Sequence, residues 1–169
     1  MQQSDSIKSA YNHDGTISMT SEKYNLDFKF AEHSLALACL RGREAVVSNF
    51  APLLQELDVT EQQWRVMRIA YEYEELPFAE LCKLCCIHKV SMARIVSFLS
   101  ERGWIEKRKS ETDLRAYTVL LTETGRDITG KAVAKAQVVH GDIFARYGQK
   151  KAELLLELLK DLDKIRRSV

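Results

Sequence analysis

Basic residues gather around the turn of an expected hairpin. Residues 104–109 and 116–121 alternate between apolar and polar side chains, which predicts two short strands joined by a turn. A hairpin that only closes a core does not need the cations found around this turn, which are Lys107, Arg108, Lys109 and Arg115. Because such side chains bind phosphate well, we expect the hairpin to contact a negatively charged partner, with DNA as the best candidate.

The helix expected before this hairpin presents polar residues that could read DNA bases. Its apolar residues, spaced three and four apart, would face a core, which leaves Lys89, Ser91 and Arg94 on the outer side. An Arg side chain can donate two parallel hydrogen bonds to guanine in the major groove. Met92 suits either a contact with a thymine methyl group or a place in the core. The alternative for Lys89, Ser91 and Arg94 is the solvated face of an ordinary helix.

Asp113 and Arg115 lie at the tip of the expected hairpin. Arg115 is placed to enter a minor groove, where narrow A·T-rich segments concentrate negative potential. Asp113 cannot bind phosphate favourably, so we expect it to hold Arg115 or Arg108 by a charge-assisted hydrogen bond. Lys107, Arg108 and Lys109 would then contact phosphates without specifying a sequence. Alternatively, these charges only keep an exposed hairpin soluble.

Three cysteines and a histidine fall within seven residues: Cys82, Cys85, Cys86 and His88. Cys-x-x-Cys spacing beside a His can bind zinc or sense oxidants. However, a closed zinc site draws its second ligand pair from elsewhere, and the remaining cysteine of the sequence is Cys39. The cluster also lies at the C-terminal end of a short expected helix, where the helix dipole disfavours a thiolate. Buried thiols are therefore the favoured interpretation.

Several helices are expected to position these residues. Between residues 30 and 53, apolar side chains recur every three or four positions, which predicts a long amphipathic helix that Pro52 ends or kinks. Thr60 and Gln63 form a capping-box pattern that starts the next helix. Pro77 suits the first turn of a short third helix, because its missing N–H would have no partner there.

The second half of the chain continues this pattern. The fourth helix stops at Gly103 and leads into the hairpin, and Thr122 caps a long helix that reaches about Tyr147. A last helix has an apolar stripe formed by Leu154, Leu155, Leu158, Leu159, Leu162 and Ile165. The predicted fold is therefore mainly α, a winged helix-turn-helix with long N- and C-terminal dimerisation helices.

The sequence divides into four segments. Residues 1–25 are polar and show no period, which predicts a mobile N-terminal arm. Residues 26–54 are assigned to a dimerisation helix, residues 58–125 to the winged helix-turn-helix DNA-binding lobe, and residues 126–169 to the C-terminal dimerisation helices.

Charge and composition narrow the class of protein. The 25 Lys and Arg residues nearly balance 24 Asp and Glu, which excludes a protein that coats nucleic acid unspecifically. Residues 89–115 nevertheless contain seven basic and four acidic side chains, whereas residues 53–80 contain two basic and seven acidic. No run approaches the ~20 apolar residues of a membrane helix, and no signal peptide is recognisable, so we expect a cytoplasmic protein. The sequence has no enzyme motif, which argues against an enzyme.

Three stretches carry a family resemblance: VTEQQWRVMRIAYE, KVSMARIVSFLSERGWIEKRK and DLRAYTVLLTETGRDI. In this order they look like the helix after the dimerisation arm, the recognition helix with the first wing strand, and the return of the wing, all of the multiple-antibiotic-resistance regulator (MarR) family. The resemblance runs from about His33 to Ile165. Within the family, LRGREAVVSNFAP and VTEQQWRVMRI are most similar to repressors of homoprotocatechuate and hydroxycinnamate catabolism.

This resemblance implies a homodimer that binds a pseudo-palindromic double-stranded operator and leaves it when a small phenolic acid binds. Arg43 lies beside the apolar stripe of the first helix, where a half-buried cation would suit the carboxylate of a small aromatic acid. The other candidate pocket residues are Trp64, Arg65, His33 and Ser34. We therefore expect a repressor of hydroxycinnamate or hydroxyphenylacetate catabolism genes, with an aromatic carboxylic acid as effector and no cofactor.

Alternatives remain at each level. Arg43 can be plain surface charge, and Trp64 can be core. The same fold can serve a redox- or metal-sensing regulator that acts through Cys82, Cys85 and Cys86. It can also serve a protein-interaction module, for which removing the basic side chains of the helix and hairpin would leave function intact.

Overall fold

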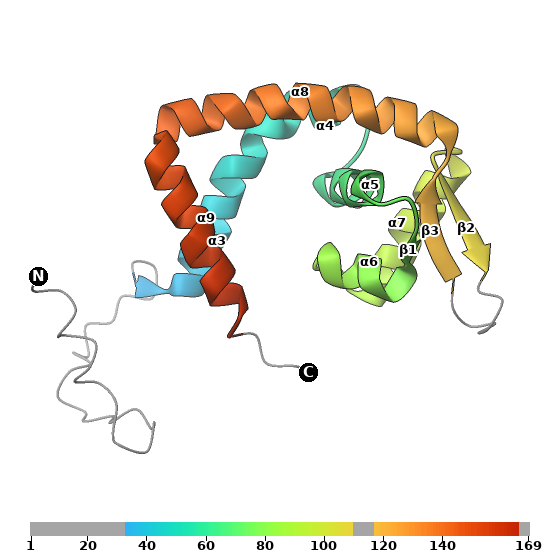
Figure 1. The fold of residues 1–169 in the computed structure, drawn as a ribbon, viewed down its shortest axis with the longest axis horizontal. Coiled ribbons are helices and arrows are strands. Elements are labelled where there is room, and N and C mark those ends of the chain that lie inside the picture. Colours follow the sequence, from blue (N-terminus) through green and yellow to red (C-terminus); the bar gives the residue numbers. More distant parts are fainter. Residues whose placement is uncertain (1–32, 110–116, 166–169) are drawn as a thin grey trace, which may run out of the picture. The chain divides into compact units, whose positions relative to one another are not determined.

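The computed structural model describes residues 33–109 and 117–165, and in these ranges the chain is mainly helical with one small sheet (Figure 1). The chain divides between Gly42 and Arg43 into two units, which are described separately. The arm expected at residues 1–25 lies outside the described residues. Within the described ranges, no helix combines the length and hydrophobicity that crossing a bilayer requires.

The winged helix-turn-helix expected from the sequence is confirmed, with a third strand added to the hairpin. In chain order the elements are α3 (Leu35–Val47), the 3-10 helix η1 (Ser48–Phe50), α4 (Ala51–Leu57), α5 (Glu61–Glu72), β1 (Leu76–Pro77), α6 (Phe78–Leu84), α7 (Lys89–Glu101), β2 (Ile105–Lys109), β3 (Tyr117–Leu121), α8 (Glu123–Tyr147) and α9 (Gln149–Asp163).

Side-chain caps start two of the helices where the sequence predicts them. The Thr60 hydroxyl accepts a hydrogen bond from the Gln63 N–H, and the Thr60 N–H donates to Gln63 Oε1 at 2.7 Å. This is the complete capping box, and it fixes the first turn of α5. At α8, the Thr122 hydroxyl accepts from the Gly125 N–H at 3.0 Å.

The two prolines mark the boundaries that differ from expectation. The expected helix over residues 30–53 breaks before Pro52: α3 ends at Val47, η1 follows, and Pro52 sits in the first turn of α4. Pro77 is not in the first turn of α6 but precedes it as the N-cap, because Leu76 and Pro77 are paired with β3.

The sheet is antiparallel, with strand order β1-β3-β2. Ile105 pairs with Leu121, and Lys107 pairs with Val119. Ile105, Val119 and Leu121 are buried, whereas Lys107, Arg108 and Lys109 are exposed at the outer part of β2. The sheet is thus anchored in the core at one end and carries charge at the other.

Two glycines fix the start of the wing. Gly103, at φ 71°, ends α7 in a Schellman motif in which the Trp104 N–H donates to the Leu99 carbonyl at 3.0 Å. The Thr122 N–H then donates to the Trp104 carbonyl, also at 3.0 Å. A Cβ at Gly125 would lie 1.9 Å from that carbonyl oxygen, so glycine is required for this close approach.

The core lies between α5, α6, α7, the sheet and the first half of α8. Val66 and Met67 of α5 and Val96 and Leu99 of α7 are fully buried. Ala136 of α8 is also buried, and its small side chain allows a close approach to neighbouring elements. This packing holds α7 and the sheet together as one lobe.

Candidate DNA-binding and effector sites

The outer face of α7 matches a recognition helix. Lys89, Ser91 and Arg94 are exposed, and α7 begins at Lys89. Met92 is fully buried in the core, so its assignment to DNA contact is corrected. Its position on α7, one turn before Val96, places it on the apolar face.

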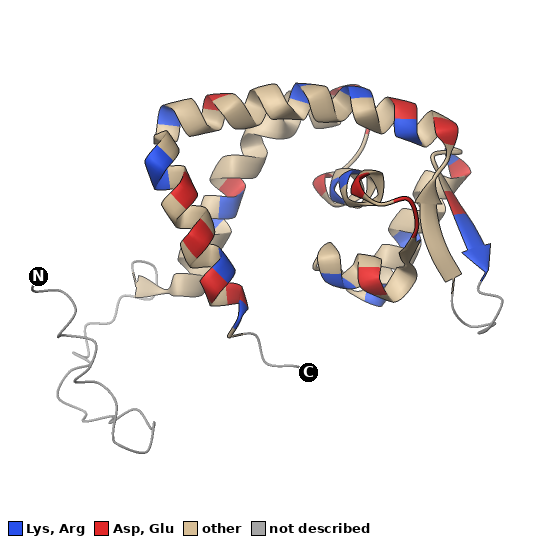
Figure 2. Ribbon diagram, viewed as in Figure 1, with Lys and Arg blue, Asp and Glu red and all other residues tan. Residues whose placement is uncertain are grey.

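The wing strand β2 carries the basic residues on its outer part (Figure 2). Lys107 Nζ donates to Ser97 Oγ of α7 at 3.4 Å, which links the wing to the recognition helix. Arg108 pairs with Glu75 at 2.7 Å, a partner that the sequence analysis did not find. Asp113 and Arg115 lie outside the described residues, so their roles stay predictions.

Arg102 secures the C-terminal end of α7. Its Nη1 donates to the carbonyls of Leu57 and Asp58, at 3.3 and 3.1 Å, and its Nη2 pairs with the Asp58 carboxylate. The guanidinium also lies 4.6 Å from the ring centroid of Phe98. The end of α7 is therefore tied to the turn between α4 and α5.

A small cavity of ≈ 140 Å³ lies between the end of α3, η1, α5 and α8. The residues that line it are Val46, Val47, Phe50, Glu61, Trp64, Arg65, Arg68 and His140. Four of these residues belong to α5, and their spacing places them on one face of that helix: Glu61, Trp64, Arg65 and Arg68. Apolar and aromatic walls with a few charged groups are typical of a small-molecule site.

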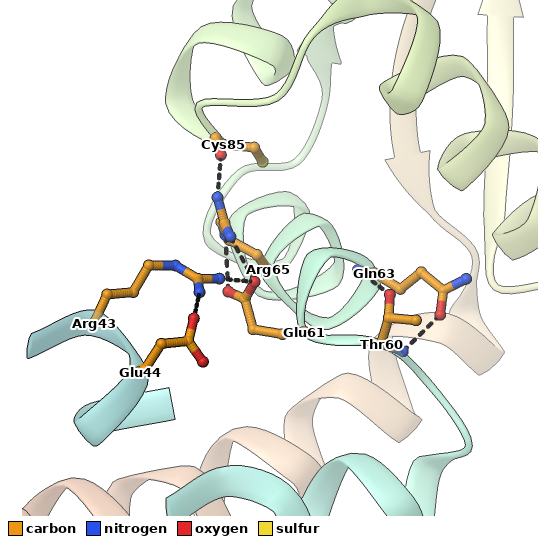
Figure 3. A network of polar contacts seen from close by, with 7 residues as sticks. All are labelled: Arg43, Glu44, Thr60, Glu61, Gln63, Arg65 and Cys85. Carbon is orange, nitrogen blue, oxygen red and sulfur yellow. Dashed lines mark hydrogen bonds and ion pairs between the residues drawn. The ribbon is translucent and has the colours of Figure 1, made fainter. Parts of the chain in front are cut away.

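A charged network lies at the Glu61 side of this cavity (Figure 3). Arg65 donates to both Glu61 oxygens, at 3.0 and 2.6 Å, and through Nη1 to the Cys85 carbonyl at 2.7 Å. Arg43 pairs with Glu61 and Glu44. Burial would raise the pKa of Glu61, but hydrogen bonds and charges from Arg65 and Arg43 outweigh it and lower the pKa, so Glu61 is ionised at neutral pH.

Arg68 and His140 are functional candidates that sequence reasoning missed. Among the described residues, Arg68 Nε is a buried side-chain nitrogen without a hydrogen-bond partner. Arg68 Nη1 lies 3.5 Å from His140 Nε2, and the His140 ring packs edge-on against Phe50 with centroids 5.0 Å apart. Burial, and then the charge of Arg68, lower the pKa of His140.

Only some of the predicted pocket residues line the cavity in the structure. Trp64 and Arg65 line the cavity as expected. Arg43 is not among the lining residues, and its guanidinium is engaged by Glu44 and Glu61 instead. His33 is exposed and Ser34 caps the start of α3; both belong to the first unit, so their role at the cavity stays a prediction.

The cysteine cluster is largely buried. Cys82 and Cys85 lie in the core, and burial raises the pKa of both thiols, that of Cys85 to about 12. Thiolate, the form that reacts with oxidants and metals, is therefore scarce at these two positions. Across the described ranges, no three His, Cys, Asp or Glu side chains are grouped so that they could hold a metal ion.

Comparisons with known proteins agree with this geometry. The homoprotocatechuate degradative operon repressor of Escherichia coli is 30% identical over 128 residues, which span 76% of this chain and 86% of that protein. The crystal structure of the transcriptional regulator PA4135 is 36% identical, with a TM-score of 0.75, and covers 79% of this chain and 98% of its own.

A third relative is the regulator NadR, solved in complex with 4-hydroxyphenylacetate. It is 29% identical, with a TM-score of 0.70, and the match covers 79% of this chain and 94% of NadR. The relatives named here are regulators and not enzymes. Residues 59–117, which contain α5, α6, α7 and β2, match the MarR family. The chain therefore belongs to the MarR family of transcriptional regulators.

Proposed function

We propose that the protein is a dimeric repressor of aromatic-acid catabolism genes that releases its operator when a small phenolic acid occupies the cavity beside α5. One observation carries the proposal: Arg68 lines the same cavity as the aromatic residues Phe50 and Trp64, and among the described residues its buried Nε has no hydrogen-bond partner. A buried donor on a cation is costly unless an acceptor satisfies it, and a carboxylate is the natural partner of a guanidinium.

The cavity offers complementary groups to the two ends of such an acid. The carboxylate accepts from Arg68, and the aromatic ring packs against Phe50 and Trp64. A phenolic hydroxyl can donate to Glu61, whose carboxylate is ionised. Two relatives support this class of ligand: NadR has been solved with 4-hydroxyphenylacetate, and the Escherichia coli relative is named for the homoprotocatechuate degradative operon.

For the operator, we propose contacts from both α7 and the wing. Arg94, Ser91 and Lys89 would reach base edges or phosphates in the major groove, and Lys109 would contact phosphate. Arg108 is partly neutralised by Glu75, so its share of the phosphate attraction is smaller. Lys89 and Arg94 of α7, which form no ion pair with the described residues, would therefore contribute more of the attraction than Arg108.

Dimerisation is proposed through the terminal helices. Leu154 and Leu158 of α9 are 55% and 56% exposed, and an apolar helix face of this kind is unstable in water without a partner. A second copy of the chain would supply it with two-fold symmetry. The two recognition helices would then meet a pseudo-palindromic operator about one turn of DNA apart, roughly 34 Å.

Arg65 provides a physical link between the effector and DNA. It joins Glu61 at the cavity to the Cys85 carbonyl, at the end of α6 and just before the connector into α7. An acid that engages Glu61 competes with Arg65 for the same carboxylate. The effector thereby favours a different setting of the turn that precedes α7, and operator affinity falls.

Operator release tests this proposal. A labelled fragment from upstream of the gene is titrated with protein at fixed salt, with and without 4-hydroxyphenylacetate, ferulate or p-coumarate. Acid binding is followed separately by the fluorescence of Trp64 in a Trp104→Phe variant, since the chain has two Trp residues. Quenching together with release supports the proposal. Tight DNA binding that no aromatic acid alters, without any change in Trp64 emission, would contradict it.

A further inference from the structure

We propose that His140 is a second, proton-dependent ligand for the carboxylate of the effector, so that the cavity takes up a proton when the acid binds. The inference rests on the proposed function, because it needs an anionic ligand in this cavity. It adds that recognition of the acid depends on the pH through one named residue of α8. The concentration of the acid and the pH would then together determine how much acid is bound at this site.

The contact between Arg68 and His140 indicates the protonation state of His140 before the acid binds. Arg68 Nη1 lies 3.5 Å from His140 Nε2. A guanidinium only donates hydrogen bonds, so in this arrangement His140 Nε2 accepts and carries no proton. In this structure the cavity therefore presents the Arg68 guanidinium beside a neutral imidazole.

A carboxylate that enters the cavity requires hydrogen-bond donors from both Arg68 and His140. It accepts from Arg68, and a carboxylate has further lone pairs that the neighbouring imidazole can satisfy only as a donor. A proton on His140 Nε2 turns the acceptor that faced Arg68 into a charged donor that faces the anion. The anion then lies between two cations, which favours it over a neutral isostere such as the corresponding amide.

The other groups that face His140 do not supply this proton switch. From α5, Arg65 and Glu61 also line the cavity, but they are paired with each other at 2.6 Å. The end of α3 and η1 contribute Val46, Val47 and Phe50, none of which titrates. On α8 itself, Asp142 pairs with Arg146 at 2.9 Å. His140 is thus the lining group whose ordinary pKa is closest to neutrality.

The direction of the pH dependence follows from the two states. In the ligand-free protein, burial and then the charge of Arg68 hold the pKa of His140 below its ordinary value of 6.5. A bound carboxylate opposes the charge of Arg68 and raises that pKa. Affinity for the acid therefore increases as the pH falls through the pKa of the complex and levels off below that of the free protein. With one proton, the limiting slope is about tenfold per pH unit.

Isothermal titration calorimetry of the full chain with 4-hydroxyphenylacetate tests this directly. Titrations in buffers of different ionisation enthalpy give the number of protons taken up, from about pH 8 to about pH 6, where the acid itself stays ionised. We expect uptake of up to one proton and an affinity that rises severalfold across this range. In His140→Asn, which keeps a polar side chain that does not titrate, both effects should vanish.

Matched variants make the outcomes decisive. His88→Asn removes a histidine that does not line the cavity and should keep the proton uptake. His140→Gln repeats the test if His140→Asn unfolds, as judged by circular dichroism. Binding of the acid without proton uptake would overturn the proposal, because His140 could then donate as a neutral imidazole in its other tautomer. The proposed effector site would not be affected by that result. Uptake that persists in both His140 variants but is lost in Glu61→Gln would overturn it too. Failure of any acid to bind at any pH would remove the proposed function as well.

Discussion

Arg65 and Arg68 lie three residues apart on α5, yet their guanidinium groups have different surroundings. Arg65 donates to Glu61 and to the Cys85 carbonyl, so its charge and its hydrogen bonds are used within the protein. Arg68 Nη1 lies 3.5 Å from His140 Nε2, and the Arg68 Nε has no hydrogen-bond partner among the described residues. At the scale of single residues, Arg68 is therefore the cation with capacity left for a ligand.

Replacing Arg68 tests which arginine holds the carboxylate. We expect Arg68→Gln to weaken binding of the acid by roughly 10-fold to 100-fold, because a hydrogen bond to a charged group contributes about 1.5–3 kcal/mol. Arg43→Gln is the comparison variant, since Arg43 does not line the cavity but pairs with Glu61, which does. Calorimetry with 4-hydroxyphenylacetate measures both. A large loss in Arg43→Gln and none in Arg68→Gln would restore the assignment made from the sequence.

DNA recognition also depends on single residues. Arg94→Ala should weaken operator binding by about 1–3 kcal/mol and relax base preference at one position, if Arg94 reads a base edge. Lys109→Ala should weaken binding to all sequences alike and reduce the slope of log affinity against log salt by about one. Fluorescence anisotropy on operator and scrambled duplexes at several salt concentrations separates the two roles. Identical behaviour of both variants would argue against base readout by Arg94.

At the scale of elements, the turn between α6 and α7 is the link that we propose between the cavity beside α5 and DNA. Arg65 reaches the carbonyl of Cys85 from α5, and Cys86 beside it has a left-handed backbone at φ 51°. A residue other than glycine held in this conformation is sensitive to the contacts around it. We therefore expect the orientation of α7 to depend on the hydrogen bond between Arg65 and Cys85.

Loss of this bond should separate binding of the acid from release of DNA. A Lys at position 65 lacks the planar fork that spans Glu61 and Cys85, so Arg65→Lys should reduce the coupling between the two ligands. The coupling is measured as the ratio of acid affinities with and without saturating operator. We expect this ratio to approach one while the acid still binds. An unchanged ratio would show that the signal takes another route.

The junction of the wing with α8 makes a stability prediction. A Cβ at Gly125 would lie 1.9 Å from the Trp104 carbonyl oxygen, so Gly125→Ala should lower the free energy of unfolding by about 1–3 kcal/mol or more. Gly141→Ala, on the same helix with nothing within 4 Å of its Cβ, should leave it unchanged or raise it by up to about 1 kcal/mol. Urea titrations followed by circular dichroism compare the two variants.

Elements with local signals were the ones that the sequence could predict. The capping pairs at Thr60 and Thr122 depend on residues three positions apart, and both are present. The strand β1 has two residues, too few to show a period, so it was missed and Pro77 was placed in the helix instead. Arg68 and His140 are 72 positions apart, and nothing in either neighbourhood indicates that they meet.

One part of that cavity could nevertheless be predicted from the helical spacing of residues in the sequence. Glu61, Trp64, Arg65 and Arg68 follow the three-and-four spacing of one helix face, so the assignment of Trp64 and Arg65 could have been extended to Arg68. Arg43 was chosen from the family resemblance and its place beside an apolar stripe. The ion pairs that engage its guanidinium depend on tertiary packing, which sequence periodicity does not show.

At the scale of the whole molecule, the proposed function requires two copies of the chain. We expect Leu158→Asp to shift the protein from dimer to monomer in light scattering, because a charge on the exposed leucine face of α9 opposes burial against a partner. Operator affinity should fall strongly at the same time, since two half-sites are no longer bound together. Glu157→Asp, a charge-conserving change at a neighbouring exposed position, serves as the control. A Leu158→Asp protein that remains dimeric would place the interface elsewhere.

The hydrogen bonds from Arg102 to the carbonyls of Leu57 and Asp58 restrict how the recognition helix can move. With its C-terminal end anchored there, α7 can only pivot about that end. Its 13 residues make a lever roughly 20 Å long. A rotation of about 6° therefore moves the far end, which carries Lys89, Ser91 and Arg94, by about 2 Å. Effector-induced release would thus begin at the N-terminal end of α7, where base contacts are lost before the phosphate contacts of the wing.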